Sequence, residues 1–186
     1  MKETRYEYDL SGRVVKTTVN GQEVSNGEIK PYNSIQEILS WDEFGRAART
    51  RNTSVVDGLT IEKISLQDIQ YDEKGRVISG RNLILSTGEG FSKYTEESMD
   101  VNSKDFDSWG RAKKYTQTLV NGGLRTTSTI NLTYNTDGLA SSQITNILEV
   151  SVNPGVDHHV ERTIKQTGMI YDAQGNLVDY TKEVKE

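Results

Sequence analysis

The chain has 186 residues, of which 33% are hydrophobic and 26% charged, and its mean hydropathy is −0.65. Any core must therefore be thin or shared among many elements. The chain has no cysteine and 2 histidines, which excludes a disulfide scaffold, a cysteine-based zinc site and thiol chemistry. Lys and Arg number 22 and Asp and Glu 27, giving a net charge of −5. This acidic balance argues against nucleic acid as a partner.

Membrane association is not expected either. The longest apolar run is three residues, 83–85, so no transmembrane helix is predicted. No charged segment followed by an apolar one opens the chain, so no signal peptide is expected. An outer-membrane β-barrel is a more distant alternative, since the strand that begins at Ala47 places Arg49 and Arg51 on one face and Thr50 and Asn52 on the other. Neither face suits lipid.

The informative feature is a short repeat. Six segments read aromatic, Asp or Asn, two variable residues, Gly, usually Arg, and a small apolar residue; they span 8–14, 41–47, 71–77, 106–112, 134–140 and 171–177. The aromatics at 8, 71 and 134 are 63 residues apart, and those at 41, 106 and 171 are 65 apart. Two copies thus make one unit. The sequence predicts a single repeat domain, 1–186, with three internal units at 1–62, 63–126 and 127–186.

The chemistry of this motif is that of a turn. In Asp-x-x-Gly, Asp occupies the first position of a type I turn, where its carboxylate accepts the backbone N–H two residues on. Gly then takes the left-handed conformation that closes the hairpin with a bulge, and the following Arg can stack on a ring. The spacing does not match an EF-hand or a Gly-rich calcium repeat. We therefore predict structural turns rather than calcium sites.

A second set of turn signals alternates with the first, at 20–21, 57–58, 88–90, 121–123 and 153–155. Together the two sets cut the chain into about twelve segments rich in Thr, Val, Ile and Tyr, which are typical of strands. The segment 23–40, which contains Asn26-Gly27 and Pro31, is the least regular and is predicted to be a longer loop or an irregular strand pair. The fold class is all-β, an antiparallel up-and-down meander.

Alternation along the strands predicts which side chains are packed. Three strands alternate cleanly; their packed faces are predicted to carry Ile130, Leu132 and Tyr134, then Ile144, Leu148, Val150 and Val152, then Val160, Ile164 and Ile170. The stretch from Leu59 to Tyr71 breaks phase twice, between Ile61 and Ile64 and between Leu66 and Ile69, and these breaks predict bulges or bends.

The ends of the chain favour closure of the sheet. An open layer of twelve strands leaves one apolar face and two edges exposed, and a barrel removes both liabilities. The strand that ends at Tyr8 corresponds to those that end at Tyr71 and Tyr134, while the strand that starts at Leu177 corresponds to their immediate neighbours. We therefore predict a closed β-barrel with pseudo-threefold repeats; the alternative is an open single-layer array, cut from a longer one.

The motif resembles the YD repeat of Rhs-type bacterial proteins. The resemblance rests on Tyr8-Asp9 with Gly12-Arg13-Val14, Tyr71-Asp72 with Gly75-Arg76-Val77, and Tyr171-Asp172 with Gly175-Asn176-Leu177. Members of that family build β-hairpin shells on large secreted or surface-associated proteins. The resemblance therefore implies a bacterial, extracellular or cell-surface setting, and it concerns the style of the fold more than an activity.

Nothing in the sequence requires an enzyme. His158 and His159 form the only histidine pair, and adjacent strand residues point to opposite faces, so they are not expected to share a metal. No nucleophile elbow, phosphate loop or dinucleotide fingerprint occurs, and no catalytic, cofactor-binding or metal residues are assigned. Two hypotheses remain. One is a structural or adhesive β-hairpin repeat module that presents a surface to protein or glycan. The other is a soluble barrel that binds a small apolar or amphipathic ligand in its lumen.

Overall fold

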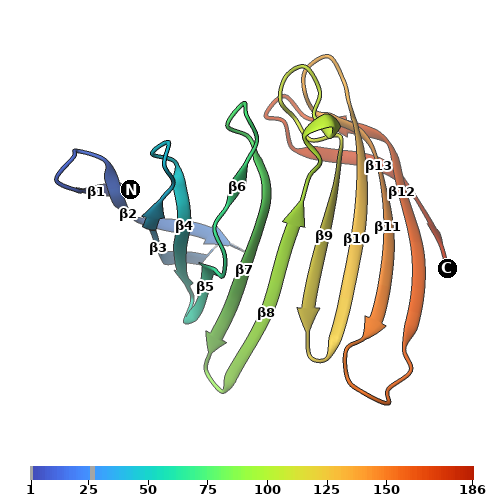
Figure 1. Ribbon diagram of the computed structural model, residues 1–186, viewed down its shortest axis with the longest axis horizontal. Coiled ribbons are helices and arrows are strands. Elements are labelled where there is room, and N and C mark those ends of the chain that lie inside the picture. The colour runs from blue at the N-terminus through green and yellow to red at the C-terminus, as the bar shows by residue number, and fades with distance from the viewer. Residues whose placement is uncertain (1, 26–27) are drawn as a thin grey trace. The chain divides into compact units, whose positions relative to one another are not determined.

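The computed structural model describes residues 2–25 and 28–186, and it is an antiparallel all-β meander of thirteen strands (Figure 1). The strands are β1 Glu3–Tyr8, β2 Val14–Ser25, β3 Glu28–Trp41, β4 Ala47–Val56, β5 Leu59–Ser65, β6 Gln70–Tyr71, β7 Val77–Gly88, β8 Phe91–Asp100, β9 Lys114–Asn121, β10 Leu124–Tyr134, β11 Ala140–Ser151, β12 His159–Tyr171 and β13 Leu177–Lys185. A 3-10 turn spans Ser103–Asp105. The predicted fold class is confirmed, and the strand beyond the predicted twelve is the two-residue β6.

The chain forms two compact units, Met1–Gln70 with Gly80–Glu97, and Tyr71–Ser79 with Ser98–Glu186. Strands β7 and β8 contribute to both. In the first unit, β1 to β5 pair in chain order and β5 pairs with β7. In the second unit, β9 to β13 pair in chain order. Every one of these pairs is antiparallel, as hairpin connections require.

The predicted closure into a barrel is not supported. A barrel gives every strand two hydrogen-bonded neighbours. In the part of the chain that the structure describes, β1 pairs with β2 alone and β13 with β12 alone, so the sheet is not closed. Both of these strands are exposed along their whole length. Of the two predicted architectures, the open array is the one consistent with this pairing.

Four of the five turns in the second set form where the sequence predicts them. Asp57-Gly58 joins β4 to β5 with positive φ at both residues, 51° and 75°, and Gly122-Gly123 joins β9 to β10 in the same way, with 56° and 83°. Two consecutive positive φ angles are the mark of the type I′ hairpin turn. The signals at 88–90 and 153–155 also fall between strands.

The turn predicted at Asn20-Gly21 is wrong. Both residues lie inside β2, where Gly21 is paired with Tyr32 of β3. A Cβ at residue 21 would lie only 2.4 Å from Cε1 of the Tyr32 ring. The glycine therefore serves the close approach of an aromatic side chain across the sheet, a role that glycine takes in strands.

Of the two alternatives predicted for 23–40, the longer loop is wrong and the strand pair is present; its irregularity is confined to the register of β3 with β4, which shifts between Ile38 and Ser40. β2 and β3 pair in an unbroken register from Lys16–Glu37 to Ser25–Glu28, and Pro31 is paired with Gln22 within it. The dipeptide Asn26-Gly27 lies outside the described residues. β2 and β3 have 12 and 14 residues. They are longer than the mean strand of about five to six residues, and the turn signals in the sequence did not predict strands of this length.

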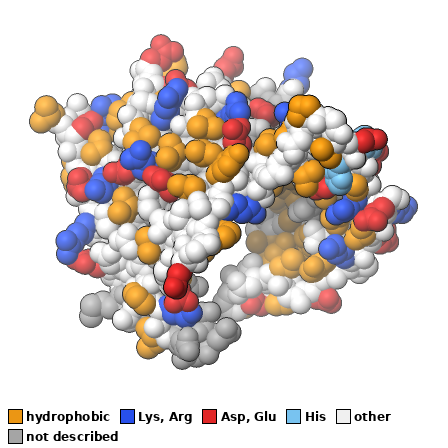
Figure 2. Space-filling model, turned by 90° about the horizontal axis from the view of Figure 1, so that it is seen from below, with side chains coloured by type: hydrophobic (Ala, Val, Ile, Leu, Met, Phe, Trp, Pro, Cys, Tyr) orange, Lys and Arg blue, Asp and Glu red, His pale blue; other side chains and the backbone are white. Residues whose placement is uncertain are grey.

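The core is thin, as the composition predicts. Among the described residues the buried hydrophobic side chains are Ala48, Val101 and Ile130, and the buried polar ones are Ser65 and Thr145. Figure 2 shows hydrophobic side chains interspersed with charged and other polar ones over the visible surface. Most other apolar side chains of the strands are half-buried or exposed, so the packing is spread thinly over the sheet.

The predicted faces are right for β10 and wrong for β11. Ile130 is buried and Leu132 half-buried, but Ile144 and Leu148 are exposed while Thr145 is buried. The reason lies in the neighbouring strands, because Thr145 is paired with Ile130 on one side and with Ile164 on the other. Side chains paired across strands share a face. The covered face of β11 is therefore set by its neighbours and not by its own alternation.

The predicted alternation of β12 holds only in its first half. Val160 and Ile164 are half-buried, but Ile170 is 54% exposed. The register with β13 shifts between Thr167 and Ile170, and Gly168 has a φ of 63°. A bulge at this point inserts an extra residue and moves the following side chains to the other face.

One of the two phase breaks between Leu59 and Tyr71 is confirmed. The break between Leu66 and Ile69 falls in the bend 66–69, which separates β5 from β6. The break between Ile61 and Ile64 lies inside β5, whose register with β4 and β7 runs without a shift. No bulge is present there.

Candidate functional site

The six repeated motifs form six turns of the same geometry. In each, the glycine N–H donates to the backbone carbonyl of the Asp or Asn at 2.9–3.1 Å, and the Asp or Asn N–H donates to the carbonyl of the residue after the glycine at 2.8–3.0 Å. The six glycines, which are Gly12, Gly45, Gly75, Gly110, Gly138 and Gly175, have φ between 76° and 85°. Glycine adopts this left-handed conformation without the penalty of a Cβ. The predicted Asp-x-x-Gly turn is confirmed.

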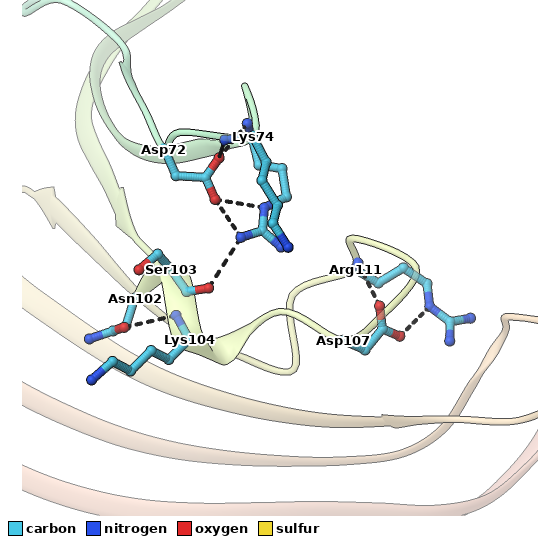
Figure 3. A network of polar contacts seen from close by, with 8 residues as sticks. Asp72, Lys74, Asn102, Ser103, Lys104, Asp107 and Arg111 are labelled. Atoms are coloured by element: carbon cyan, nitrogen blue, oxygen red, sulfur yellow. Dashed lines mark hydrogen bonds and ion pairs between the residues drawn. The ribbon is translucent and has the colours of Figure 1, made fainter.

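The side chain of the first turn residue is fully engaged, as Asp72 shows (Figure 3). Its Oδ1 accepts the backbone N–H groups of Lys74 and Arg76, both at 2.9 Å, and its Oδ2 binds the Arg76 guanidinium at 2.6 Å from Nε and 2.5 Å from Nη2. The first of these contacts is the predicted one. The ion pair within the turn was not predicted, although its signal is present in the sequence as an Arg four residues after the Asp.

These contacts lower the pKa of the turn aspartates Asp9, Asp42, Asp72, Asp107 and Asp172. For Asp72 the largest cause is the hydrogen bond from the Arg76 side chain, and for Asp172 it is the one from the Asn176 side chain. At Asp42 and Asp107 partial burial is the largest influence and raises the pKa, but the hydrogen bonds from the turn outweigh it. The carboxylates are therefore charged at neutral pH and already bonded.

The arginines of three turns contact the aromatic residue that opens the next motif. The distances from the guanidinium carbon to the ring centroid are 4.5 Å for Arg13 and Trp41, 4.0 Å for Arg76 and Phe106, and 4.3 Å for Arg111 and Tyr134. These are cation–π contacts. The sequence predicts that the arginine stacks on a ring, but it does not show that the ring belongs to the following motif, about thirty residues on.

Tyrosine hydroxyls add a second link between neighbouring turns. Tyr134 donates to the backbone carbonyl of Ala112 at 2.7 Å, and Tyr171 donates to that of Ala140 at 2.8 Å. Burial raises the pKa of Tyr134, so its hydroxyl keeps the donated proton. We call the linked turns the turn row: it comprises 9–13 and 42–46 in the first unit, and 72–76, 107–111, 135–139 and 172–176 in the second.

Other charged side chains on the strands are also paired. Arg49 Nε lies 2.6 Å from Asp68 Oδ1, and Arg51 Nε lies 3.2 Å from Glu62 Oε1. Each of these two cations thus lies beside a carboxylate.

The two histidines bind different carboxylates. His158 Nε2 lies 2.7 Å from Glu149 Oε1, and His159 Nε2 lies 3.1 Å from Glu161 Oε1. Within residues 2–25 and 28–186, no group of three or more His, Cys, Asp or Glu side chains could hold a metal ion.

The second unit carries a surface groove of about 530 Å³ on strands β10 to β12. Its lining includes hydroxyl, amide and charged groups, from Thr127, Asn146, Thr163, Glu161 and Arg162. Ile147 and Leu148 line it as well, so the groove offers a mixed polar and apolar contact surface.

Comparisons with known proteins identify no relative of this chain. No protein-family model matches the chain, and no match is found among curated proteins. In the described residues, no helix is long and apolar enough to cross a membrane.

The link between turns is measurable as a coupling energy. We expect Arg76→Ala and Phe106→Ala to be non-additive, with a coupling of about 1 kcal/mol in the free energy of unfolding, because each change removes the same cation–π contact. The measurement is a double-mutant cycle by urea denaturation. Arg125→Ala, which removes an exposed arginine near the opposite end of β10, is the control and should add to Phe106→Ala. If the losses in free energy of unfolding were additive for Arg76→Ala with Phe106→Ala, as for the control pair, the link between the turns would be contradicted.

Proposed function

We propose that the chain is a non-enzymatic structural or adhesive β-hairpin repeat module of a larger bacterial surface or secreted protein. The observation that carries this proposal is that the recurring polar and aromatic residues of the motifs bind one another. The carboxylate or amide of each motif is bonded inside its own turn, and the rings and guanidinium groups join neighbouring turns. Repetition of such contacts stiffens an array, because each repeat is braced by its neighbours.

The variable positions of the turns support an adhesive role. Leu10 and Phe44 in the first unit are 109% and 73% exposed, and Trp109 in the second is 80% exposed. These side chains project from the turns, whose other residues are engaged in holding the backbone. Exposed aromatic residues beside paired charges are suited to contact a protein or a glycan.

The alternative function, a barrel with a small apolar ligand in its lumen, requires a closed sheet. The strand pairing does not support closure, and the groove of the second unit is an open surface feature with charged residues in its lining rather than an enclosed lumen. The resemblance to YD-repeat proteins and the hairpin turns support the module and its extracellular setting instead.

The two functions differ in their response to an apolar ligand. We expect the melting temperature of the full chain to stay the same when palmitate is added at increasing concentrations, because a structural module has no site that would hold it. A ligand that binds only the folded state raises the melting temperature progressively with its concentration. Such a rise, with binding of one palmitate per chain in calorimetry, would overturn the proposal in favour of a ligand-binding protein.

A further inference from the structure

The two edge strands differ from all the others in what they leave exposed. In the described part of the chain, the row of hydrogen-bonded strands begins with β1 and ends with β13. Each of these two strands has one neighbour, and all of their residues are exposed. Tyr6 is 53% and Val178 60% exposed. An edge strand presents a row of unpaired backbone N–H and C=O groups, which is a template for another strand.

The repeat identifies the strand that suits each edge. β13 follows the motif at 171 as β9 follows the motif at 106, with a spacing of 65, and β1 precedes the motif at 8 as β10 precedes the motif at 134, with a spacing of 126. β9 and β10 are paired antiparallel to each other, with Lys114 opposite Asn131. A pair formed by β13 and β1 would therefore repeat a pair that the second unit already contains.

We propose that β13 of one copy of the chain pairs with β1 of a second copy, in the register of β9 and β10. The residue that corresponds to Lys114, 65 positions further on, is Asp179, and the residue that corresponds to Asn131, 126 positions earlier, is Arg5. In the proposed pair, these opposite charges would face each other. The next positions along the two segments are Lys113 and Leu132, where the Leu132 N–H donates to the Lys113 carbonyl at 2.7 Å. Their counterparts in the proposed pair are Val178 and Tyr6. Ion pairs and aromatic–aliphatic pairs directly across two strands both stabilise a sheet.

Tyr8 provides an independent observation. Its counterparts Tyr134 and Tyr171 each donate their hydroxyl to a carbonyl of the preceding motif, Ala112 and Ala140. Tyr8 belongs to the first motif of the chain and is 60% exposed. In the proposed register, the carbonyl that corresponds to Ala112 is that of Leu177 in the second copy. The same contact that joins neighbouring turns within a unit would then join two copies.

The sixth motif limits the strength of this contact. It carries Asn176 where the motif at 106 carries Arg111, which lies over the Tyr134 ring. The Tyr8 ring would gain the hydrogen bond without the cation–π contact, so the association is reversible. Because two different edges meet, the contact is head-to-tail, and each added copy leaves a free edge for another until the ends meet in a ring. The inference rests on the proposed function as a repeat module.

Sedimentation velocity of the full chain over a wide concentration range tests the pairing. The average mass should rise with concentration for the wild type. Arg5→Asp and Asp179→Arg each place like charges across the pair and should weaken association roughly tenfold. An equimolar mixture of the two variants restores opposite charges at every contact between unlike chains, and the double variant restores them at every contact. Both should recover the association that each single variant loses.

Lys185→Glu is the matched control, because it reverses a charge on the same strand at a position beyond the stretch that faces β1, where its partner in β12 is the uncharged Thr163, and it should associate normally. Circular dichroism of every variant establishes that the fold is kept. A chain that stays monomeric at all concentrations, or variants whose mixture does not recover, would overturn the proposed pairing. Neither result would affect the palmitate experiment, so failure of this inference is distinguishable from failure of the proposed function.

Discussion

Replacing Ile130 with alanine should lower the free energy of unfolding by about 2–4 kcal/mol, the cost of emptying a buried isoleucine site. Ile130 is 5% exposed and is one of three buried hydrophobic residues in the described chain. It is paired with Tyr115 on one side and Thr145 on the other. Because backbone hydrogen bonds hold these neighbouring strands in place, they cannot close over the space that the smaller alanine side chain would leave. Urea denaturation followed by tryptophan fluorescence measures the loss.

Ile170→Ala is the control for this change. It removes the same atoms from another strand, and so loses the same preference for extended backbone, but Ile170 is 54% exposed. We expect a loss below about 1 kcal/mol. Equal losses at the two positions would mean that burial in this thin core does not concentrate stability, and that the sheet is held by its backbone alone.

The second large effect is on acid stability. The pKa of each of the five turn aspartates lies below 3.8 in the folded chain. Above pH 3.8 the carboxylates are ionised in both states and their full contribution to stability is present. As the pH falls below 3.8, the unfolded chain takes up protons first, so stability is lost progressively down through the folded pKa values. Urea midpoints measured from pH 7 to pH 2 should fall steeply below about pH 4.

The fifth motif, which has Asn135 in place of the turn aspartate, suggests a variant that tests whether the aspartates cause this loss of stability in acid. Asn135 holds its turn with an uncharged oxygen, which accepts the N–H groups of Asp137 at 3.1 Å and Leu139 at 2.9 Å. Asp72→Asn therefore keeps the acceptor and removes one titrating group, so its stability should depend less steeply on pH. Glu73→Gln, which removes an exposed carboxylate from the same turn, should leave the slope unchanged. Identical slopes for the wild type and Asp72→Asn would contradict the assignment.

The local turns could be predicted from the sequence because their chemistry is local. Asp and Gly three residues apart define the hydrogen bonds of the turn whatever surrounds them. The role of Gly21 could not be predicted in this way, because it depends on Tyr32, which is eleven residues away in the sequence and opposite it in the sheet. The same local reading found the turn carboxylates of the site, but it could not show which ring each arginine contacts, because those partners are brought together by strand pairing.

The face of β11 and the closure of the sheet also depend on partners distant in sequence. Thr145 is buried because Ile130 and Ile164 flank it, and no pattern within β11 records that. Equivalent first and last strands fit a closed barrel and an open array equally well, so the sequence alone did not discriminate between them. The grouping into units at 1–62, 63–126 and 127–186 stays a prediction.

The arginine–ring contacts described above all lie at the turn row, whereas the other ends of the hairpins are closed by backbone turns such as Asp57-Gly58 and Gly122-Gly123. At that second end the connection between β11 and β12 extends over residues 152–158, while the connections at 57–58 and 122–123 have two residues each. Length variation is thus already accommodated there. Peptide tags, epitopes or whole inserted domains belong at these turns, where they would leave the contacts of the turn row intact.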